Sequence, residues 1–159
     1  MSVFKNVADI QTADMLKLPV PEAHYHNIAL KPSEYQKEIV ASLAERAEKV
    51  RNREVDSSVD NMLIITNDGR KLALDQRLVN PMLPSDPNSK AAKCAENVFE
   101  IWQRTVDRRS AQMIFCDLST PKDDGTFSVY DDIRAKLLEL GVPENEIAFI
   151  HNAKSEVQK

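Results

Sequence analysis

The order of apolar runs and helix signals in the last third of the chain constrains its fold more than any other feature. Residues 111–118 (AQMIFCDL) form a dense run of apolar, β-forming residues, and residues 146–151 (EIAFIH) form a second run. Between them, Ser128 has the position of a helix N-terminal cap and Gly141 that of the glycine that ends a helix. Strand, helix and strand of these lengths predict a βαβ unit, with parallel strands joined by a right-handed crossover.

The sequence therefore divides into three segments. Residues 1–31 predict a linker with a weak helix before residue 18 and a strand at 24–30. Residues 32–109 predict a helical region, and residues 110–159 predict the βαβ unit followed by the start of another helix. The expected fold class is α/β. Because parallel strands are normally buried in sheets of several members, we expect residues 110–159 to be the incomplete start of a larger domain.

Within the helical region, the helix starts are the clearest signals. Ser33 and Gln36 have the spacing of a capping box, and a helix with a wide apolar face is expected from Ser89 to Arg108. Between these helices, Ser57 offers a further cap. Two shorter helical pieces are expected on either side of the sequence NDG, at residues 67–69.

Composition excludes several classes of protein. The net charge of −4 argues against coating nucleic acid by bulk charge, although it permits a local basic groove. With only 3 glycines, the chain has no Gly-rich phosphate loop. The sequence contains no apolar segment long enough to span a membrane, and its first ten residues, MSVFKNVADI, lack the hydrophobic region of a signal peptide. We therefore expect no signal peptide and no membrane partner. The 2 cysteines then predict reduced thiols and a cytoplasmic location.

Two constellations suggest catalysis or metal binding, and both have a simpler explanation. Cys116 and His151 lie near the ends of two strands that finish on the same edge of the expected sheet, so a thiol–imidazole pair is conceivable. Cys116 continues the apolar run before it, which favours a buried packing role, as does the mid-helix position of Cys94. His24 and His26 lie on one face of the expected strand, but no third ligand is recognisable nearby, so no metal site is predicted.

The candidates for binding phosphate are hydroxyls and basic side chains. Ser119 and Thr120 come just after the first expected strand, where hydroxyls and free amides can hold a phosphate, although the same residues often cap turns. Several arginines and lysines gather near the expected helix C-termini. The helix dipole alone favours cations there, and contacts with nucleic-acid phosphates are the alternative. They are Arg46, Lys49, Arg51, Arg53, Arg104, Arg108 and Arg109.

Several stretches, in order, resemble one family, the Swi/Snf-type motors of helicase superfamily 2. The similarity covers most of residues 9–159 and rests on order and spacing more than on any single motif. Five stretches carry it, and the first four are LKLPVPEAHYHNIALKPSEYQKEIVASL, KLALDQRLVNPML, NSKAAKCAENVFEIWQ and QMIFCDLST. The fourth is similar to motif IV, at the start of the second RecA-like lobe. EIAFIHNAKSEVQK is similar to the next strand and turn, with His151 and Asn152 in place of an aspartate and a glycine.

The resemblance is greatest to a bacterial subgroup of large mobile-element proteins, in which such a motor is joined to a DNA methyltransferase-like region. It implies a truncated RecA-like βαβ unit in the second lobe of an ATP-dependent DNA helicase or translocase. It also implies that Ser119, Thr120 and Lys122 face the DNA backbone. ATP and Mg²⁺ are implied for the full-length motor and no cofactor for this segment, since the family's ATP-binding motifs match nothing here. The partners implied are DNA, the first lobe and the remainder of the second.

Two other functions compete with this interpretation. One is a protein-interaction module that docks a partner through the helices expected at 33–53 and 89–108. The other is a small α/β hydrolase that uses Cys116 and His151. In addition, the exposed strand edges of an incomplete sheet would favour self-association of the chain.

Overall fold

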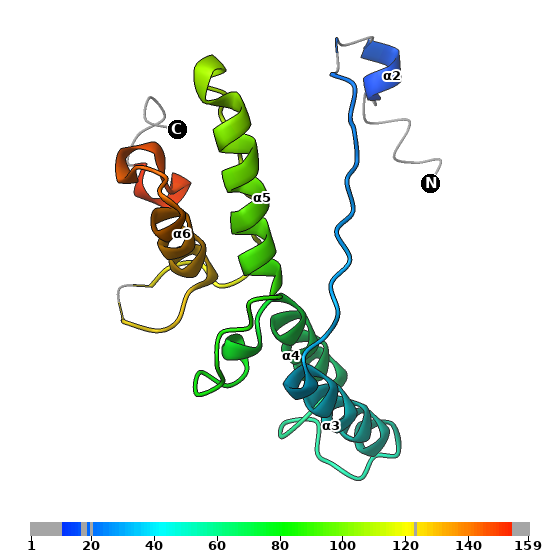
Figure 1. Ribbon diagram of the computed structural model, residues 1–159. Coiled ribbons are helices and arrows are strands. Elements are labelled where there is room, and N and C mark those ends of the chain that lie inside the picture. Colours follow the sequence, from blue (N-terminus) through cyan, green and yellow to red (C-terminus); the bar gives the residue numbers. More distant parts are fainter. Residues whose placement is uncertain (1–10, 17–18, 20, 123, 154–159) are drawn as a thin grey trace.

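The computed structural model of the protein describes the structure of residues 11–16, 19, 21–122 and 124–153. Its regular structure consists of helices (Figure 1). The longer ones are α3 (Glu34–Arg51), α4 (Met62–Leu74), α5 (Lys90–Thr105) and α6 (Val129–Leu140), and a short α2 (Ala13–Leu16) precedes them. Single 3₁₀ turns complete the set: η1 (Gln76–Leu78), η2 (Val106–Arg108), η3 (Glu144–Glu146) and η4 (Ile150–Asn152).

The four longer helices form two pairs. Helix α3 packs on α4, and α5 packs on α6 (Figure 1). The core lies between α5 and α6, where Val129 is 0% exposed and Ala91, Ala95, Ile133 and Leu137 surround it. In contrast, no residue of α3 is buried, and α4 buries only Ile65 and Leu72. The α3–α4 pair is therefore the less well-packed part of the molecule.

A cluster of charged side chains joins the two pairs. Arg77 in η1 donates two hydrogen bonds to Asp75, through Nε (2.9 Å) and Nη2 (2.8 Å), and a third from Nη1 to Asp132 of α6 (3.0 Å). Lys136 Nζ approaches the same Asp132 oxygen at 2.8 Å, and the Arg77 guanidinium lies 4.1 Å from the centre of the Phe127 ring. Asp75 is 1% exposed, so the guanidinium neutralises a carboxylate that is withdrawn from water. We call these five residues the charged hub.

Most of the helix caps predicted from sequence are confirmed, at the ends of α3, α5 and α6. Ser33 Oγ accepts from the Gln36 amide at 3.1 Å, and Gln36 Oε1 accepts from the Ser33 amide at 3.0 Å, which completes the capping box. Ser89 caps α5, Ser128 caps α6, and Gly141 ends α6 in the left-handed region with φ of 103°. These caps need only partners within a few residues, which is why sequence alone identifies them.

The expected α/β fold class is wrong, because the described residues contain no strand and thus no RecA-like βαβ unit. No backbone–backbone hydrogen bond joins residues 111–118 to another described segment, and the Met113 and Phe115 side chains are 82% and 88% exposed. Ile147 and Phe149 do have extended backbone angles, yet no ladder pairs them with any other part of the chain that the structure describes. A β-forming run becomes a strand only when a second segment takes its hydrogen bonds, and here none does.

Two smaller expectations are wrong, and two others lie wholly or mostly outside the described residues. The stretch 24–30, expected as a strand, is exposed and irregular apart from half-buried Leu30. The two pieces expected around residues 67–69 form one continuous helix, α4, whose N-cap is Asn61 rather than Ser57. The helix expected after residue 153 lies outside the described residues, as does most of the one expected before residue 18.

No helix in the described part of the chain is long and apolar enough to cross a membrane.

Candidate functional site

The loop between residues 118 and 127 holds the three residues that sequence proposed as phosphate contacts. Ser119 has a left-handed backbone, with φ of 63°. Its Oγ accepts from the Val129 amide at 2.9 Å, and its carbonyl accepts from Ser128 Oγ at 3.2 Å. Both groups therefore hold the first turn of α6, so the hydroxyl oxygen serves as a helix cap formed from ten residues away.

Thr120 and Lys122 lie on the solvent side of the same loop. Both are exposed, and no hydrogen bond or ion pair joins their side chains to another described residue. Further along, Asp124 accepts from the Thr126 hydroxyl at 2.6 Å and from its amide at 3.0 Å, which closes a tight turn. These bonds, assisted by the charge of Lys122, lower the pKa of Asp124. The structure thus leaves Thr120 and Lys122 exposed and turns the Ser119 hydroxyl toward the start of α6.

The surroundings of this loop are more acidic than a strong phosphate site requires. Asp124 and Asp131 are exposed nearby, and Asp117 is half of a surface ion pair with Arg70 at 2.6 Å. A single ammonium beside several carboxylates gains little from a phosphate at physiological salt. Any contact made here is one of several that a nucleic-acid complex would need.

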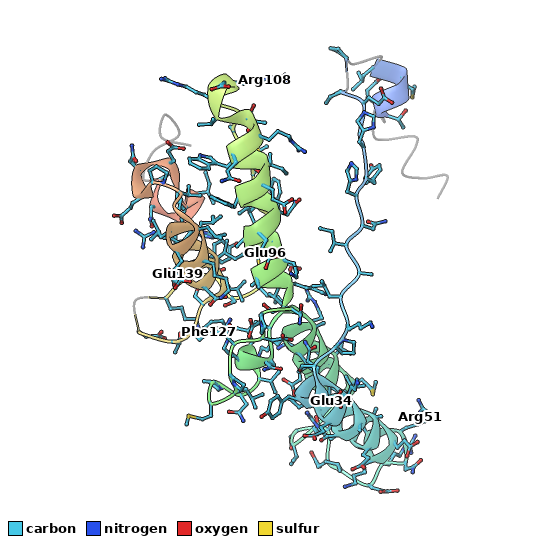
Figure 2. The ribbon with its side chains drawn as sticks, in the orientation of Figure 1. Glu34, Arg51, Glu96, Arg108, Phe127 and Glu139 are labelled. Carbon is cyan, nitrogen blue, oxygen red and sulfur yellow. The ribbon has the colours of Figure 1, made fainter. Side chains whose placement is uncertain are left out.

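The basic side chains do not gather into one groove. Arg46 is occupied by two carboxylates, Asp60 at 2.7 Å and Asp68 at 2.9 Å, whose hydrogen bonds raise the pKa of the guanidinium. Arg51 and Arg108 lie at opposite ends of the molecule (Figure 2). The most buried of these cations is Arg77, which sequence did not single out and which serves the charged hub.

Cys116 and His151 do not form a catalytic pair. The Cys116 thiol donates to the Leu118 carbonyl at 3.1 Å, and the Cys116 carbonyl accepts from the Tyr130 hydroxyl. The His151 ring instead lies edge-on to Tyr130, with centroids 5.3 Å apart. Cys94 is half-buried, and burial raises the pKa of its thiol, followed by the charge of Cys116. These thiols are packing groups, as the sequence pattern indicates.

No metal centre is formed within the described residues. His24 and His26 are both exposed, and no cluster of three or more potential ligands occurs in that part of the chain.

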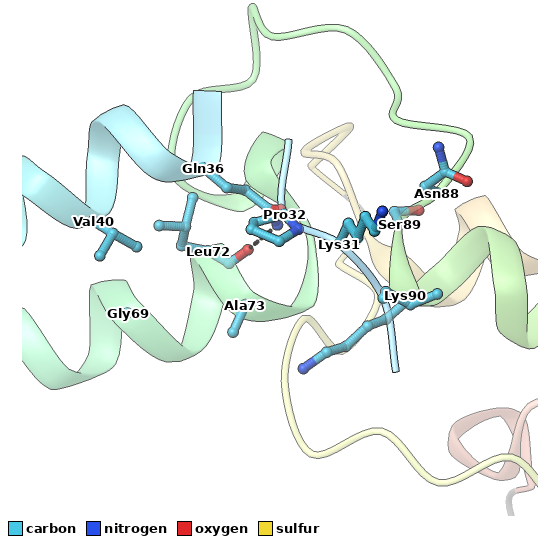
Figure 3. Close-up of a pocket in the computed structure, with 11 residues that line it drawn as sticks. Lys31, Pro32, Gln36, Val40, Gly69, Leu72, Ala73, Asn88, Ser89 and Lys90 are labelled. Atoms are coloured by element: carbon cyan, nitrogen blue, oxygen red, sulfur yellow. Dashed lines mark hydrogen bonds between the residues drawn. The ribbon is translucent and has the colours of Figure 1, made fainter. Parts of the chain in front are cut away.

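The structure adds one feature that sequence did not reveal, a groove between α3, α4 and the start of α5 (Figure 3). It holds about 240 Å³ and is lined mainly by apolar groups, with Lys31 and Lys90 at its edge. Gly69, a glycine inside a helical pattern, is a sequence signal that is compatible with a groove at this position. A glycine there favours a break between two helices equally well.

No family model matches the sequence, and neither a curated protein nor a solved structure matches the chain. The function is therefore argued from the residues and their geometry.

Proposed function

We propose that the chain is a non-catalytic segment of an ATP-driven DNA motor of the Swi/Snf type, in which it supplies scaffold and contacts to the DNA backbone. The ordered resemblance of five stretches to that family is one support. The observation that carries the proposal is the loop after residue 118. Ser119 anchors it to the first turn of α6, and Thr120 and Lys122 are exposed with no hydrogen bond or ion pair from their side chains to a described residue.

Chemically, this pair suits a sequence-independent contact. A hydroxyl and an ammonium on a fixed loop can both donate to a phosphate oxygen, and such contacts position a protein on DNA without reading bases. ATP and Mg²⁺ have no assigned ligands in this segment and would be bound by other parts of the motor. The 159-residue chain alone is therefore expected to hydrolyse no ATP.

DNA binding by the chain tests the proposal. We expect weak binding to duplex DNA, with a dissociation constant on the order of 10⁻⁴ to 10⁻⁶ M that rises steeply with salt. Lys122→Ala should reduce the slope of log K against log[salt] by about 1, and Thr120→Ala should weaken binding at all salt concentrations. Fluorescence anisotropy with a labelled oligonucleotide measures both.

Thr66→Ala is a matched control for the threonine variant, because Thr66 is also exposed but its hydroxyl donates within α4 to the Met62 carbonyl. The control should bind DNA like the parent chain. Absence of DNA binding, or equal binding by all three variants, would refute the role of this loop. In the complete motor, Thr120→Ala should lower DNA stimulation of ATP hydrolysis while leaving the folding stability unchanged.

A further inference from the structure

The groove between α3 and α4 is built as a shallow apolar hollow with a basic edge. Val40 of α3 and Gly69, Leu72 and Ala73 of α4 line it, and Lys31 and Lys90 stand at the end near α5 (Figure 3). Val40 remains 56% exposed although it faces this hollow. The helix pair thus leaves apolar surface open to water along the seam between its two members.

The size of the groove indicates the kind of occupant. Pockets that enclose a cofactor or a drug-sized molecule hold roughly 300–1,000 Å³ and bury most of the ligand. A volume of about 240 Å³ in an open hollow is enough for one or two apolar side chains of a larger molecule. A segment of protein that runs over the seam fits this geometry, in the manner of an amphipathic helix laid into a groove.

Gly69 supports the same conclusion because the fold of this chain does not require a glycine there. It lies in the middle of α4, where glycine weakens a helix relative to alanine. A Cβ added at this position would meet its nearest neighbour, Leu43 Cδ1, at 3.8 Å, which is ordinary contact. The missing methyl group therefore serves no packing need within the described structure, and Gly69 lines the groove without a side chain.

Charge then selects the chemistry of the occupant. Lys31 and Lys90 are exposed, and neither makes an ion pair with a carboxylate of the described residues. The exposed Asn88 beside them adds a polar side chain at the same end. A partner with apolar side chains on one face and carboxylates at one end would bury the former and neutralise the ammonium groups with the latter.

We propose that this groove docks an acidic, amphipathic helix of a partner protein. Its apolar face covers Val40, Gly69 and Ala73, and its carboxylates lie between Lys31 and Lys90. The inference is independent of DNA binding by the loop after residue 118, which involves none of these residues.

A pair of synthetic peptides tests the proposal with the full 159-residue chain. The first is a fluorescein-labelled helix of about four turns with leucines on one face and glutamates flanking them, and the second has lysines in place of the glutamates. We expect the acidic peptide to bind roughly tenfold more tightly than the basic one in an anisotropy titration. A spin label on the acidic peptide should broaden the amide signals of Gly69 and Ala73.

Two sets of variants assign the binding to the groove. The double variant Lys31→Glu with Lys90→Glu should weaken binding of the acidic peptide about tenfold. Lys49→Glu with Arg51→Glu changes the charge equally at exposed positions outside the groove, and should have a small effect. Gly69→Ala should raise the melting temperature by roughly 2–4 °C, because alanine has the higher helix propensity. The same variant should bind the acidic peptide more weakly, because the added methyl group makes the groove shallower.

Several results would overturn the proposal. They are absence of peptide binding, equal binding of both peptides, and broadening at residues outside the groove. Binding of duplex DNA that depends on Lys31 and Lys90 would assign the site to nucleic acid instead. A dimer in light scattering that is abolished by Gly69→Ala would assign it to a second copy of the chain.

Discussion

At the scale of single residues, Ser119 shows how the hydrogen bonds of a side chain within the fold can make it unavailable to a ligand. Its backbone adopts a left-handed conformation that costs a non-glycine residue energy. In return, its hydroxyl and carbonyl oxygens satisfy the Val129 amide and the Ser128 hydroxyl at the start of α6. The residue is therefore best understood as an anchor for the loop that presents Thr120 and Lys122.

Two substitutions at Ser119 separate these contributions. Ser119→Ala removes the hydroxyl and keeps the left-handed backbone, so we expect a loss of about 1–2 kcal/mol in the free energy of unfolding. Ser119→Gly removes the same hydroxyl but adopts the left-handed region freely, so its loss should be smaller by about 1 kcal/mol. Urea denaturation followed by circular dichroism measures both. Equal losses would mean that the backbone conformation carries no strain.

At the scale of elements, the charged hub decides how the two helix pairs are joined. Burial alone would raise the pKa of Asp132, but hydrogen bonds and charges from Arg77 and Lys136 outweigh it, and the net effect lowers the pKa. The hydrogen bonds that Arg77 donates to Asp75 raise the pKa of its guanidinium. Burial opposes this shift, the hydrogen bond to Asp132 adds to it, and the net effect keeps Arg77 charged. Removing Arg77 would leave Asp75 buried and unpaired, which typically costs 3–5 kcal/mol.

Acid should therefore loosen this junction. A carboxylate whose pKa is lower in the folded state stabilises the fold above its unfolded value of about 3.9, and the stabilisation is lost as pH falls toward the folded value. We expect the free energy of unfolding to fall as pH drops below about 4.5, and Asp132→Asn to be less stable at pH 7 with a shallower acid dependence. Asp107→Asn, at an exposed position, is the control. Parallel pH profiles for Asp132→Asn and the parent would contradict the role of the hub.

At the scale of the whole molecule, the fold consists of a well-packed pair of helices, α5 and α6, and a second pair, α3 and α4, that buries few residues. The α5–α6 pair contains the core, whereas residues 111–116 cross its surface without regular structure. Gln112 ties this stretch to α5 through a 3.0 Å hydrogen bond to the Val98 carbonyl. The exposed Met113 and Phe115 side chains leave apolar surface beside it.

Hydrogen exchange distinguishes this arrangement from a sheet. The amides of Met113, Ile114 and Phe115 have no backbone acceptor among the described residues, so they should exchange at rates close to those of an unstructured peptide. The amides of Ile133 and Leu137, inside α6, should be protected by orders of magnitude. Mass spectrometry or NMR measures both sets. Strong protection at 113–115 would show that the segment pairs with another strand in solution.

The sequence by itself determined the features whose hydrogen-bonding partners lie within a few residues along the chain. Ser33 and Gln36 cap α3, Ser89 caps α5 and Gly141 ends α6, because each satisfies backbone groups of its own helix end. The same locality explains why Asp124 and Thr126 close a turn.

Only the tertiary structure decided the features that depend on distant groups. Residues 111–118 have every local property of a strand, yet a strand requires a ladder partner, and none is present in the described chain. The hub joins Arg77 to a carboxylate 55 positions away, and the groove exists because α3 and α4 leave their seam uncovered. Local propensity sets which conformations a segment prefers, whereas pairing and burial depend on what the rest of the chain brings beside it.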